Sequence, residues 1–377
     1  MKAHDIKFIA LIILLIGITA IPSCNIGDTT TAETITISSD INSPTTWKGD
    51  NIYIIDKDNL YLNAELIIEA GAIIKMMSGS NIMLNRNGNV VANGTSSKPI
   101  VFTSIKDDNN GSDSNSDGDN TVPAAGDWGY INLNGSQNST FTHCKFLYGG
   151  RDNSNPATVD VSSEAKAIFD NCTFAYNSGG LLNSIYVGAL NASNASAETS
   201  ITNCKFYGNN VPVTINAEMS MDNSNSFSND KLGNKCNGIF ISGSNISTDI
   251  SWLEDEVAFV VTAANLDIET NRTLTFGNNV VVKFVEHSTL TVSNEGCLIN
   301  HDGNGVFFTS LKDDERKGDT NGDGNETIPE VADWWGEYQQ KPLDDGAAGF
   351  WTDMGEPAWS NEESPERLVM KHHLGMH

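Results

Sequence analysis

The sequence has few basic residues for its length. Only 22 Lys and Arg stand against 48 Asp and Glu, which gives a formal net charge of −26. A surface this acidic repels nucleic acid and anionic membrane surfaces, so nucleic acid is excluded as a partner. The same charge attracts cations, and calcium above all.

Helix-forming runs are also scarce. No helical pattern separates the apolar segments, which argues against alternating strands and helices. Asn, Ser, Thr, Gly and Asp are abundant instead, and they favour many short strands joined by turns. Hydrophobic residues make up 39% of the 377 residues, so the chain is able to bury a core and is not disordered as a whole.

The sequence lacks the usual catalytic signatures. It contains no CxxC pair, no Cys/His metal spacing, no nucleophile elbow and no phosphate loop. No group of carboxylates stands on adjacent repeats as a hydrolase would require. Lys145 and Lys205 are expected to line up on an outer face with Thr173 between them, and we interpret them as solvated surface positions. The expectation is therefore a protein without catalytic residues.

The N-terminus has the features of a targeting segment. Lys2 and Lys7 precede an apolar run over residues 8–21 that is too short for a membrane span. The run closes on a small residue followed by Cys24, and in this it resembles a bacterial lipoprotein signal. The resemblance implies that residues 1–23 are removed and that Cys24 carries the lipid. The alternative is an ordinary cleaved signal peptide with a chance cysteine.

The segment that follows, residues 24–46, is rich in Thr and Ser and is predicted to form a tether. The other five cysteines are Cys144, Cys172, Cys204, Cys236 and Cys297. Three of them stand in repeated strands, so packing in a core is favoured over disulfide bonds.

A short phrase recurs in the middle of the chain. The copies are FTHCKFLYGG from Phe141, FDNCTFAYNS from Phe169, ITNCKFYGNN from Ile201 and a decayed MDNSNSFSND from Met221. Cys and Phe stand two residues apart in the first three copies, which places both on one face of a strand. Asn171 and Asn203 interrupt the alternation, and asparagine tolerates the left-handed conformation of a tight turn.

The three copies recur after 28 and 32 residues, a spacing that fits one coil of a parallel β-helix. Stacked coils would align the Phe and Cys positions as interior ladders and the Asn positions as a ladder at the turn. The phrase resembles the pectin-lyase-like β-helix repeat, which implies an all-β, right-handed parallel β-helix (solenoid). A β-sandwich with chance similarity is the alternative.

A second repeat is longer and frames the first. NLYLNAELIIEAGAIIKMM from Asn59 matches NLDIETNRTLTFGNNVVVKF from Asn265, and IVFTSIKDD from Ile100 matches VFFTSLKDD from Val306. Both copies run through an acidic insert to an Asp-Trp pair, at residues 127–128 and 333–334. This arrangement resembles lipoproteins and surface proteins of Bacteroidetes-type bacteria. We predict a β-helix over residues 47–335, with related modules at about 52–131 and 257–335.

The acidic inserts resemble the front half of an EF-hand loop, with oxygen ligands at positions 1, 3 and 5 and Gly at position 6. The predicted Ca²⁺ ligands are Asp113, Asn115, Asp117, Asp119 and Asp127 in the first insert and Asp319, Asn321, Asp323, Asn325 and Glu330 in the second. Glu330 occupies position 12, whereas Ala124 stands there in the first insert, so Asp127 is nominated instead. The alternative is a solvated acidic loop.

Residues 336–377 depart from the repeat, and we interpret them as a frameshifted or truncated end. If they are genuine, their aromatic side chains would cap the open end of the solenoid.

Together these observations predict a monomeric, non-catalytic lipoprotein of the cell envelope, placed at the outer membrane or cell surface. It would be anchored to the membrane through Cys24 and would bind a polysaccharide or surface partner in adhesion or glycan binding. The alternative is a calcium-dependent polysaccharide lyase or glycoside hydrolase. Tyr148, Tyr176 and Tyr207 form either a sugar-stacking strip or edge packing between coils.

Overall fold

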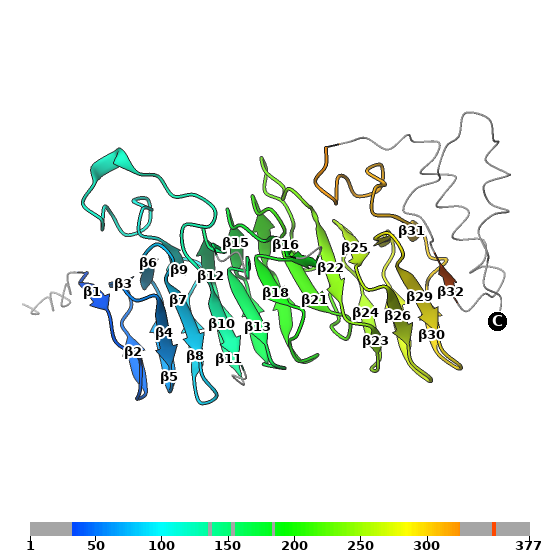
Figure 1. Cartoon of the computed structure of the whole chain (residues 1–377), viewed down its shortest axis with the longest axis horizontal. Coiled ribbons are helices and arrows are strands. Elements are labelled where there is room, and N and C mark those ends of the chain that lie inside the picture. Colours follow the sequence, from blue (N-terminus) through cyan, green and yellow to red (C-terminus); the bar gives the residue numbers. More distant parts are fainter. Residues whose placement is uncertain (1–31, 135–137, 152–154, 183–184, 325–348, 352–377) are drawn as a thin grey trace, which may run out of the picture. The chain divides into compact units, whose positions relative to one another are not determined.

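Short strands joined by turns build the part of the chain that follows the N-terminal segment (Figure 1). The computed structural model describes residues 32–134, 138–151, 155–182, 185–324 and 349–351. It divides the chain into two compact units, Met1–Ala32 and Glu33–His377, of which the first contributes a single described residue. No helix among the described residues has the length and apolar character needed to cross a membrane. The predicted signal peptide and most of the tail lie outside the described residues.

Three parallel sheets form the sides of the solenoid. Sheet I contains β1 (Thr34–Ile37), β3 (Ile52–Ile55), β6 (Ile73–Met76), β9 (Ile100–Ser104), β12 (Cys144–Leu147), β15 (Thr173–Ala175) and β20 (Lys205–Tyr207). Sheet II contains β4 (Asn59–Leu62), β7 (Asn81–Leu84), β10 (Ile131–Asn134), β13 (Val159–Ser162), β18 (Leu190–Ala192), β21 (Val213–Asn216), β22 (Gly238–Ser242), β25 (Ala258–Val261), β28 (Val281–Phe284) and β31 (Phe307–Ser310). Sheet III contains β2 (Thr45–Trp47), β5 (Glu65–Glu69), β8 (Asn89–Asn93), β11 (Ser139–Thr142), β14 (Ala167–Asp170) and β19 (Ser200–Thr202).

Two smaller sheets continue the coils toward the C-terminal side. Sheet IV contains β23 (Asn245–Ile246), β26 (Asn265–Ile268), β29 (Thr289–Val292) and an antiparallel strand, β32 (Gly349–Trp351). Sheet V contains β24 (Ile250–Trp252), β27 (Thr273–Phe276) and β30 (Cys297–Ile299). An antiparallel hairpin, β16 (Gly180–Leu182) with β17 (Ile185–Val187), stands apart from these sheets, and the one helical element of the described residues is the 3-10 turn η1 (Gly118–Asn120). The expected all-β, parallel β-helix fold is confirmed.

Phenylalanines from successive coils form an interior ladder. Phe146 stacks on Phe102 with ring centroids 5.1 Å apart and on Phe174 at 4.7 Å. The ladder continues through Phe206 and Phe227 at 5.1 and 5.3 Å. All five rings are buried, and each stacked pair contributes roughly 0.5–1.5 kcal/mol beyond its burial. The predicted Phe ladder is therefore confirmed.

The cysteines of the repeated phrase form a second ladder. Cys144, Cys172 and Cys204 are buried and free, and the Sγ of Cys172 donates to the carbonyl of Phe141 at 3.3 Å. Burial raises the pKa of Cys172 and Cys204 well above the ordinary thiol value. The thiols of Cys172 and Cys204 therefore stay protonated. All three cysteines pack in the core as small apolar groups, as the sequence predicted.

The turn inside each copy is also as predicted. Asn171 and Asn203 have φ of 54° and 53°, and His143 takes the same place in the first copy with φ of 48°. The side chain of Asn203 bonds Asp170 at 2.9 Å, so these residues do not form a stacked amide ladder of their own.

A buried asparagine ladder lies at a different turn. The Nδ2 of Asn177 donates to the carbonyl of Phe146 at 2.9 Å and to the Oδ1 of Asn209 at 3.0 Å. Asn209 repeats this pattern one coil later, with the carbonyl of Phe174 and the Oδ1 of Asn234 both at 2.9 Å. The amides thereby satisfy buried backbone carbonyls that the turn would otherwise leave without donors.

The solenoid begins earlier than the sequence predicted. Strand β1, which belongs to the segment predicted as a tether, pairs in parallel with β3 and joins sheet I. The alternating threonine and isoleucine of this strand place Ile35 and Ile37 against the core. These residues therefore extend the core instead of forming part of a tether.

The two related modules belong to one solenoid, because sheet II runs without a break from β4 to β31. A tryptophan just before each module stacks on an aromatic ring of its first strand, Trp47 on Tyr53 at 4.8 Å and Trp252 on Phe259 at 5.0 Å. Related strands nevertheless lie in different sheets: β6 and β9 belong to sheet I, whereas their counterparts β28 and β31 belong to sheet II.

Two acidic loops leave the solenoid at equivalent places (Figure 1). The first acidic loop, residues 105–127, follows β9 and returns to β10. The second acidic loop begins at residue 311, after β31, and is described as far as residue 324.

Candidate metal-binding loops

Both acidic loops begin after a strand that ends in Phe-Thr-Ser, and the threonine of that strand fixes the start of the loop. The hydroxyl of Thr103 donates to Oδ2 of Asp107 at 2.5 Å, and the hydroxyl of Thr309 donates to Oδ2 of Asp313 at 2.7 Å. Both aspartates are buried, with 1% of their surface exposed. The first turn of each loop is thus held against its strand by a hydrogen bond that little water reaches.

A left-handed turn of two residues precedes the first predicted ligand of each loop. Gly111 and Ser112 have φ of 82° and 61°, and Lys317 and Gly318 have φ of 62° and 73°. The left-handed region costs energy for Ser112 and Lys317, which are not glycines. Such turns persist only where the surrounding contacts hold them.

Three carboxylates converge in each loop, with one ligand oxygen from each lying within 4.8 Å of the others. The groups are Asp108, Asp113 and Asp117 in the first loop and Asp314, Asp319 and Asp323 in the second. Four of these six residues were predicted from the EF-hand-like pattern. Asp108 and Asp314 were missed because they belong to the KDD segment at the strand end, before that pattern begins.

The bend that brings the carboxylates together is the same in both loops. Oδ2 of Asp113 accepts the backbone N–H of Gly118 at 2.9 Å, and Oδ2 of Asp319 accepts that of Gly324 at 2.9 Å. These glycines have φ of 62° and 72°, a conformation that glycine adopts without strain. The glycine at position 6 therefore has the role predicted for it.

Several oxygens of the first loop have no hydrogen-bond donor. Oδ1 of Asp108, Oδ1 of Asn115 and Oδ1 of Asp117 are buried and make no hydrogen bond. Burial raises the pKa of Asp108, and the nearby charge of Asp113 raises it further. In the second loop burial raises the pKa of Asp314 to about 6, and Asp319 adds to the rise. Acceptor oxygens gathered without donors have the chemistry that a hard cation requires.

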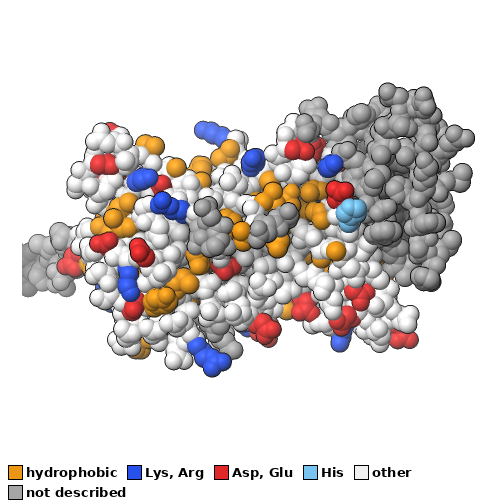
Figure 2. Space-filling model, viewed as in Figure 1, with side chains coloured by type: hydrophobic (Ala, Val, Ile, Leu, Met, Phe, Trp, Pro, Cys, Tyr) orange, Lys and Arg blue, Asp and Glu red, His pale blue; other side chains and the backbone are white. Residues whose placement is uncertain are grey.

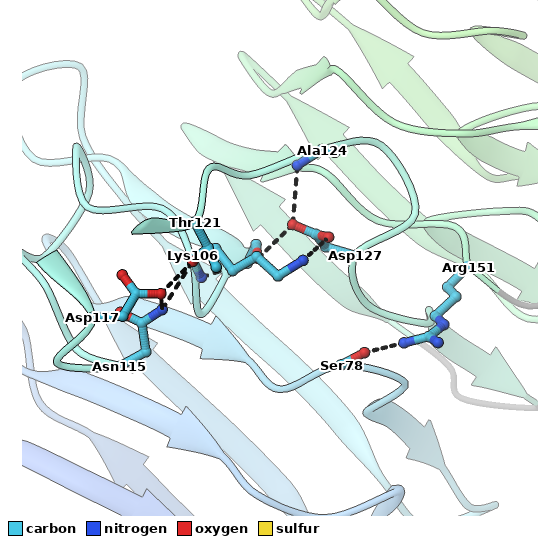
Figure 3. Close-up of polar contacts among 9 residues, drawn as sticks. Ser78, Lys106, Asn115, Asp117, Thr121, Ala124, Asp127 and Arg151 are labelled. Atoms are coloured by element: carbon cyan, nitrogen blue, oxygen red, sulfur yellow. Dashed lines mark hydrogen bonds and ion pairs between the residues drawn. The ribbon is translucent and has the colours of Figure 1, made fainter. Parts of the chain in front are cut away.

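Two other predicted ligands of the first loop lie outside its carboxylate group. Asp119 is exposed, within η1. Asp127 lies apart from Asn115 and Asp117, and its carboxylate faces Lys106 (Figure 3). Its carboxylate accepts Ser104 Oγ at 2.9 Å, Lys106 Nζ at 2.7 Å and the N–H of Ala124 at 3.0 Å.

Asp127 therefore closes the return of the loop onto β9, and Asp108 takes its place in the carboxylate group. In the second loop Asn321 donates to Asp323 at 2.8 Å, as Asn115 does to Asp117 at 2.9 Å. Three predicted site residues lie outside the described residues: Asn325, Glu330 and Cys24.

The second loop packs onto an apolar cluster on the outside of sheet II. The Sγ of Cys236 donates to the carbonyl of Asn321 at 3.3 Å. A Cβ on Gly322 would lie 2.7 Å from that sulfur, so the close approach requires glycine. Beside it Tyr186 of the hairpin stacks on Phe240 at 4.2 Å. This loop is therefore anchored to the coil beneath it.

The outer face of sheet I aligns the lysines of the repeated phrase as expected. Lys145 stands opposite Thr173 and Thr173 opposite Lys205 in the register of β12, β15 and β20. Side chains two coils apart on this face are separated by roughly 10 Å, since adjacent strands lie about 4.8 Å apart.

The three tyrosines next to this row pack against one another. Tyr148 and Tyr176 stack with centroids 5.6 Å apart, and Tyr207 meets Tyr176 edge-on at 5.7 Å. Burial raises the pKa of Tyr148 to about 12, and Tyr176 is 38% exposed. Mutual stacking occupies the ring faces, which favours edge packing between coils over a sugar-stacking strip. Figure 2 shows hydrophobic patches among scattered charged side chains on the face that it draws.

Residues 39–158 match the family model of the pectate-lyase-like β-helix domain. The matched segment begins in the first coils, contains the whole first acidic loop and reaches the first copy of the Cys–Phe phrase. No curated protein and no solved structure matches the chain. The match agrees with the β-helix resemblance of the short repeats. It fits a carbohydrate-related function and does not distinguish binding from cleavage.

Proposed function

We propose that this chain is a lipid-anchored protein of the bacterial cell envelope whose β-helix is stabilised by calcium and holds a glycan or surface partner without cleaving it. One observation carries the calcium-binding part of the proposal: the same group of three carboxylates recurs in two loops at equivalent strand ends. A solvated acidic loop has no reason to gather like charges twice in the same geometry, because their repulsion opposes folding.

Calcium fits these groups better than other common cations. It accepts six to eight oxygen ligands in flexible geometry, and carboxylates, amide oxygens and water supply them. The first loop offers Asp108, Asp113, Asp117 and the donor-free Oδ1 of Asn115. The second offers its three aspartates, with Asn325 and Glu330 as further proposed ligands. Long inserts without a core of their own would gain order from such an ion.

The chemistry around the loops favours binding over cleavage. A calcium-dependent lyase needs an accessible base near the metal. Lys75 and Lys283, whose charges act on the carboxylate groups, have no exposed surface. Lys106 is held by Asp127 at 2.7 Å. The family match is the observation that favours the alternative, a calcium-dependent polysaccharide lyase or glycoside hydrolase.

Calorimetric titration of the chelator-treated full chain with CaCl₂ tests the proposal. We expect two sites and a rise in melting temperature, since a ligand at 100 times its Kd stabilises by about 2.7 kcal/mol. Asp108→Asn should weaken one site, whereas Asp119→Asn, at an exposed position outside the carboxylate group, should keep both. Absence of calcium binding in the wild-type chain would remove the proposal.

The same protein, incubated with acidic polysaccharides and calcium, separates the two functions. Formation of unsaturated products, followed by ultraviolet absorbance and stopped by chelator, would establish the lyase. Retention of the protein on a polysaccharide gel without product supports glycan binding.

A further inference from the structure

A fully buried lysine lies beneath each acidic loop. Lys75 projects from β6 and Lys283 from β28, and neither has any exposed surface. The two strands belong to different sheets, yet each lysine occupies the same place relative to its loop. Burying an ammonium group costs free energy unless hydrogen bonds and opposite charges offset it. Two lysines buried at equivalent places therefore indicate that each has a structural or functional role.

Both lysines bind the same backbone atom of the loop. The Nζ of Lys75 donates to the carbonyl of Ser112, and the Nζ of Lys283 donates to the carbonyl of Gly318 at 2.8 Å. A hydroxyl two residues later donates to the same carbonyl, from Ser114 at 3.3 Å and from Thr320 at 3.1 Å. Lys283 also reaches the Thr320 hydroxyl at 2.6 Å.

The carbonyl that each lysine binds lies at the end of the left-handed turn that leads into the loop. Ser112 and Gly318 are the second residues of the left-handed turns, and each immediately precedes the first aspartate of the EF-hand-like pattern. A charged hydrogen bond to that carbonyl fixes where the next residue begins. It also supplies the outside contact that a strained left-handed turn needs.

We infer that Lys75 and Lys283 are positioning residues that hold the entry turn of each loop and so preform its metal site. This inference rests on the calcium binding proposed above. The lysines do not touch the metal. They act through the backbone, as the outer residues around metal ligands commonly do.

Electrostatics alone makes the opposite prediction, which gives the inference a sharp test. The charges of Asp107, Asp108 and Asp113 act on Lys75, and those of Asp313, Asp314 and Asp319 act on Lys283. If each lysine were merely a neighbouring cation, its removal would strengthen calcium binding. If it positions the turn, its removal weakens binding.

The test is calcium calorimetry on full-length Lys75→Met and Lys283→Met, which keep most of the side-chain volume. We expect each variant to lose at least tenfold in affinity at one site, within the 10- to 100-fold typical of residues that support metal ligands, and to keep the other site. The retained site reports that the solenoid is folded. Lys145→Met, on the same sheet as Lys75 but away from the loop, is the control and should bind as the wild type does.

Unchanged or tighter binding at both sites would overturn the inference while leaving the proposed function intact. A wild-type chain that binds no calcium would instead overturn the proposed function. In that case hydrogen exchange of the loop amides still tests the positioning role, because Lys75→Met should speed exchange in the first loop and not in the second. Should Lys75→Met fail to fold, Lys75→Gln restores a neutral donor and is compared at the same site.

Discussion

Glu254 is a carboxylate buried in the turn between β24 and β25. Its Oε1 accepts the N–H groups of Asp255 at 3.0 Å and Glu256 at 2.9 Å, whereas Oε2 is buried without a hydrogen bond. Burial raises the pKa of Glu254 from 4.5 to about 7, although these backbone hydrogen bonds oppose the rise. The folded protein therefore retains a proton at pH values where the unfolded chain has already released it.

The free energy of unfolding should respond to pH through this residue. Between about pH 4.5 and 7 the folded state binds more protons than the unfolded state, so the free energy of unfolding falls as pH rises. Above pH 7 the folded protein bears the full cost of burying the ionised Glu254 carboxylate. The shift corresponds to roughly 3 kcal/mol, since one pKa unit is worth about 1.4 kcal/mol. Glu254→Gln should flatten the dependence and be the more stable protein at pH 8. Urea unfolding between pH 5 and 8 measures this, and parallel curves for the two proteins would refute it.

At the scale of an element, the asparagine ladder joins the turns of successive coils. Asn209→Leu removes the donor to the carbonyl of Phe174 and the acceptor for both nitrogens of Asn177. Buried groups left without partners cost about 1–3 kcal/mol each, so a loss of roughly 2–4 kcal/mol is expected. Urea unfolding midpoints check it, with the exposed Asn223→Leu as a control expected to stay within about 0.5 kcal/mol. Equal midpoints for both variants would show that the ladder is not needed.

The elements that could be predicted are those with a local signal. Phe146 and Phe174 were predicted as interior residues because a two-residue alternation, repeated in register, is typical of stacked strands that bury one face. The ladder through Asn177 had no such signal, since asparagine is common in every turn of this chain. Asp108 was not predicted as a ligand for a related reason. A carboxylate that follows a strand end is brought to the other carboxylates only when the loop folds back over it.

At the scale of the whole molecule, the long repeat predicted two related modules but not their orientation. Coil length varies along the chain, so the alignment does not reveal that β6 and its counterpart β28 belong to different sheets. Lys75 and Lys283 were likewise hidden, because a lysine pointing out of a sheet is ordinarily solvated. Only the loop folded over each of them makes it a buried residue.

A solenoid whose coils contact only their neighbours should lose stability locally. Phe174→Ala opens a cavity in the middle of the phenylalanine ladder and should cost about 3–5 kcal/mol. Its stacking partners are Phe146 and Phe206, so amide exchange should accelerate most in β12, β15 and β20. Strands β28 and β31, which lie several coils away, should exchange as in the wild type. Hydrogen exchange with mass spectrometry resolves these strands. A uniform acceleration would instead mean that the whole solenoid unfolds as one cooperative unit.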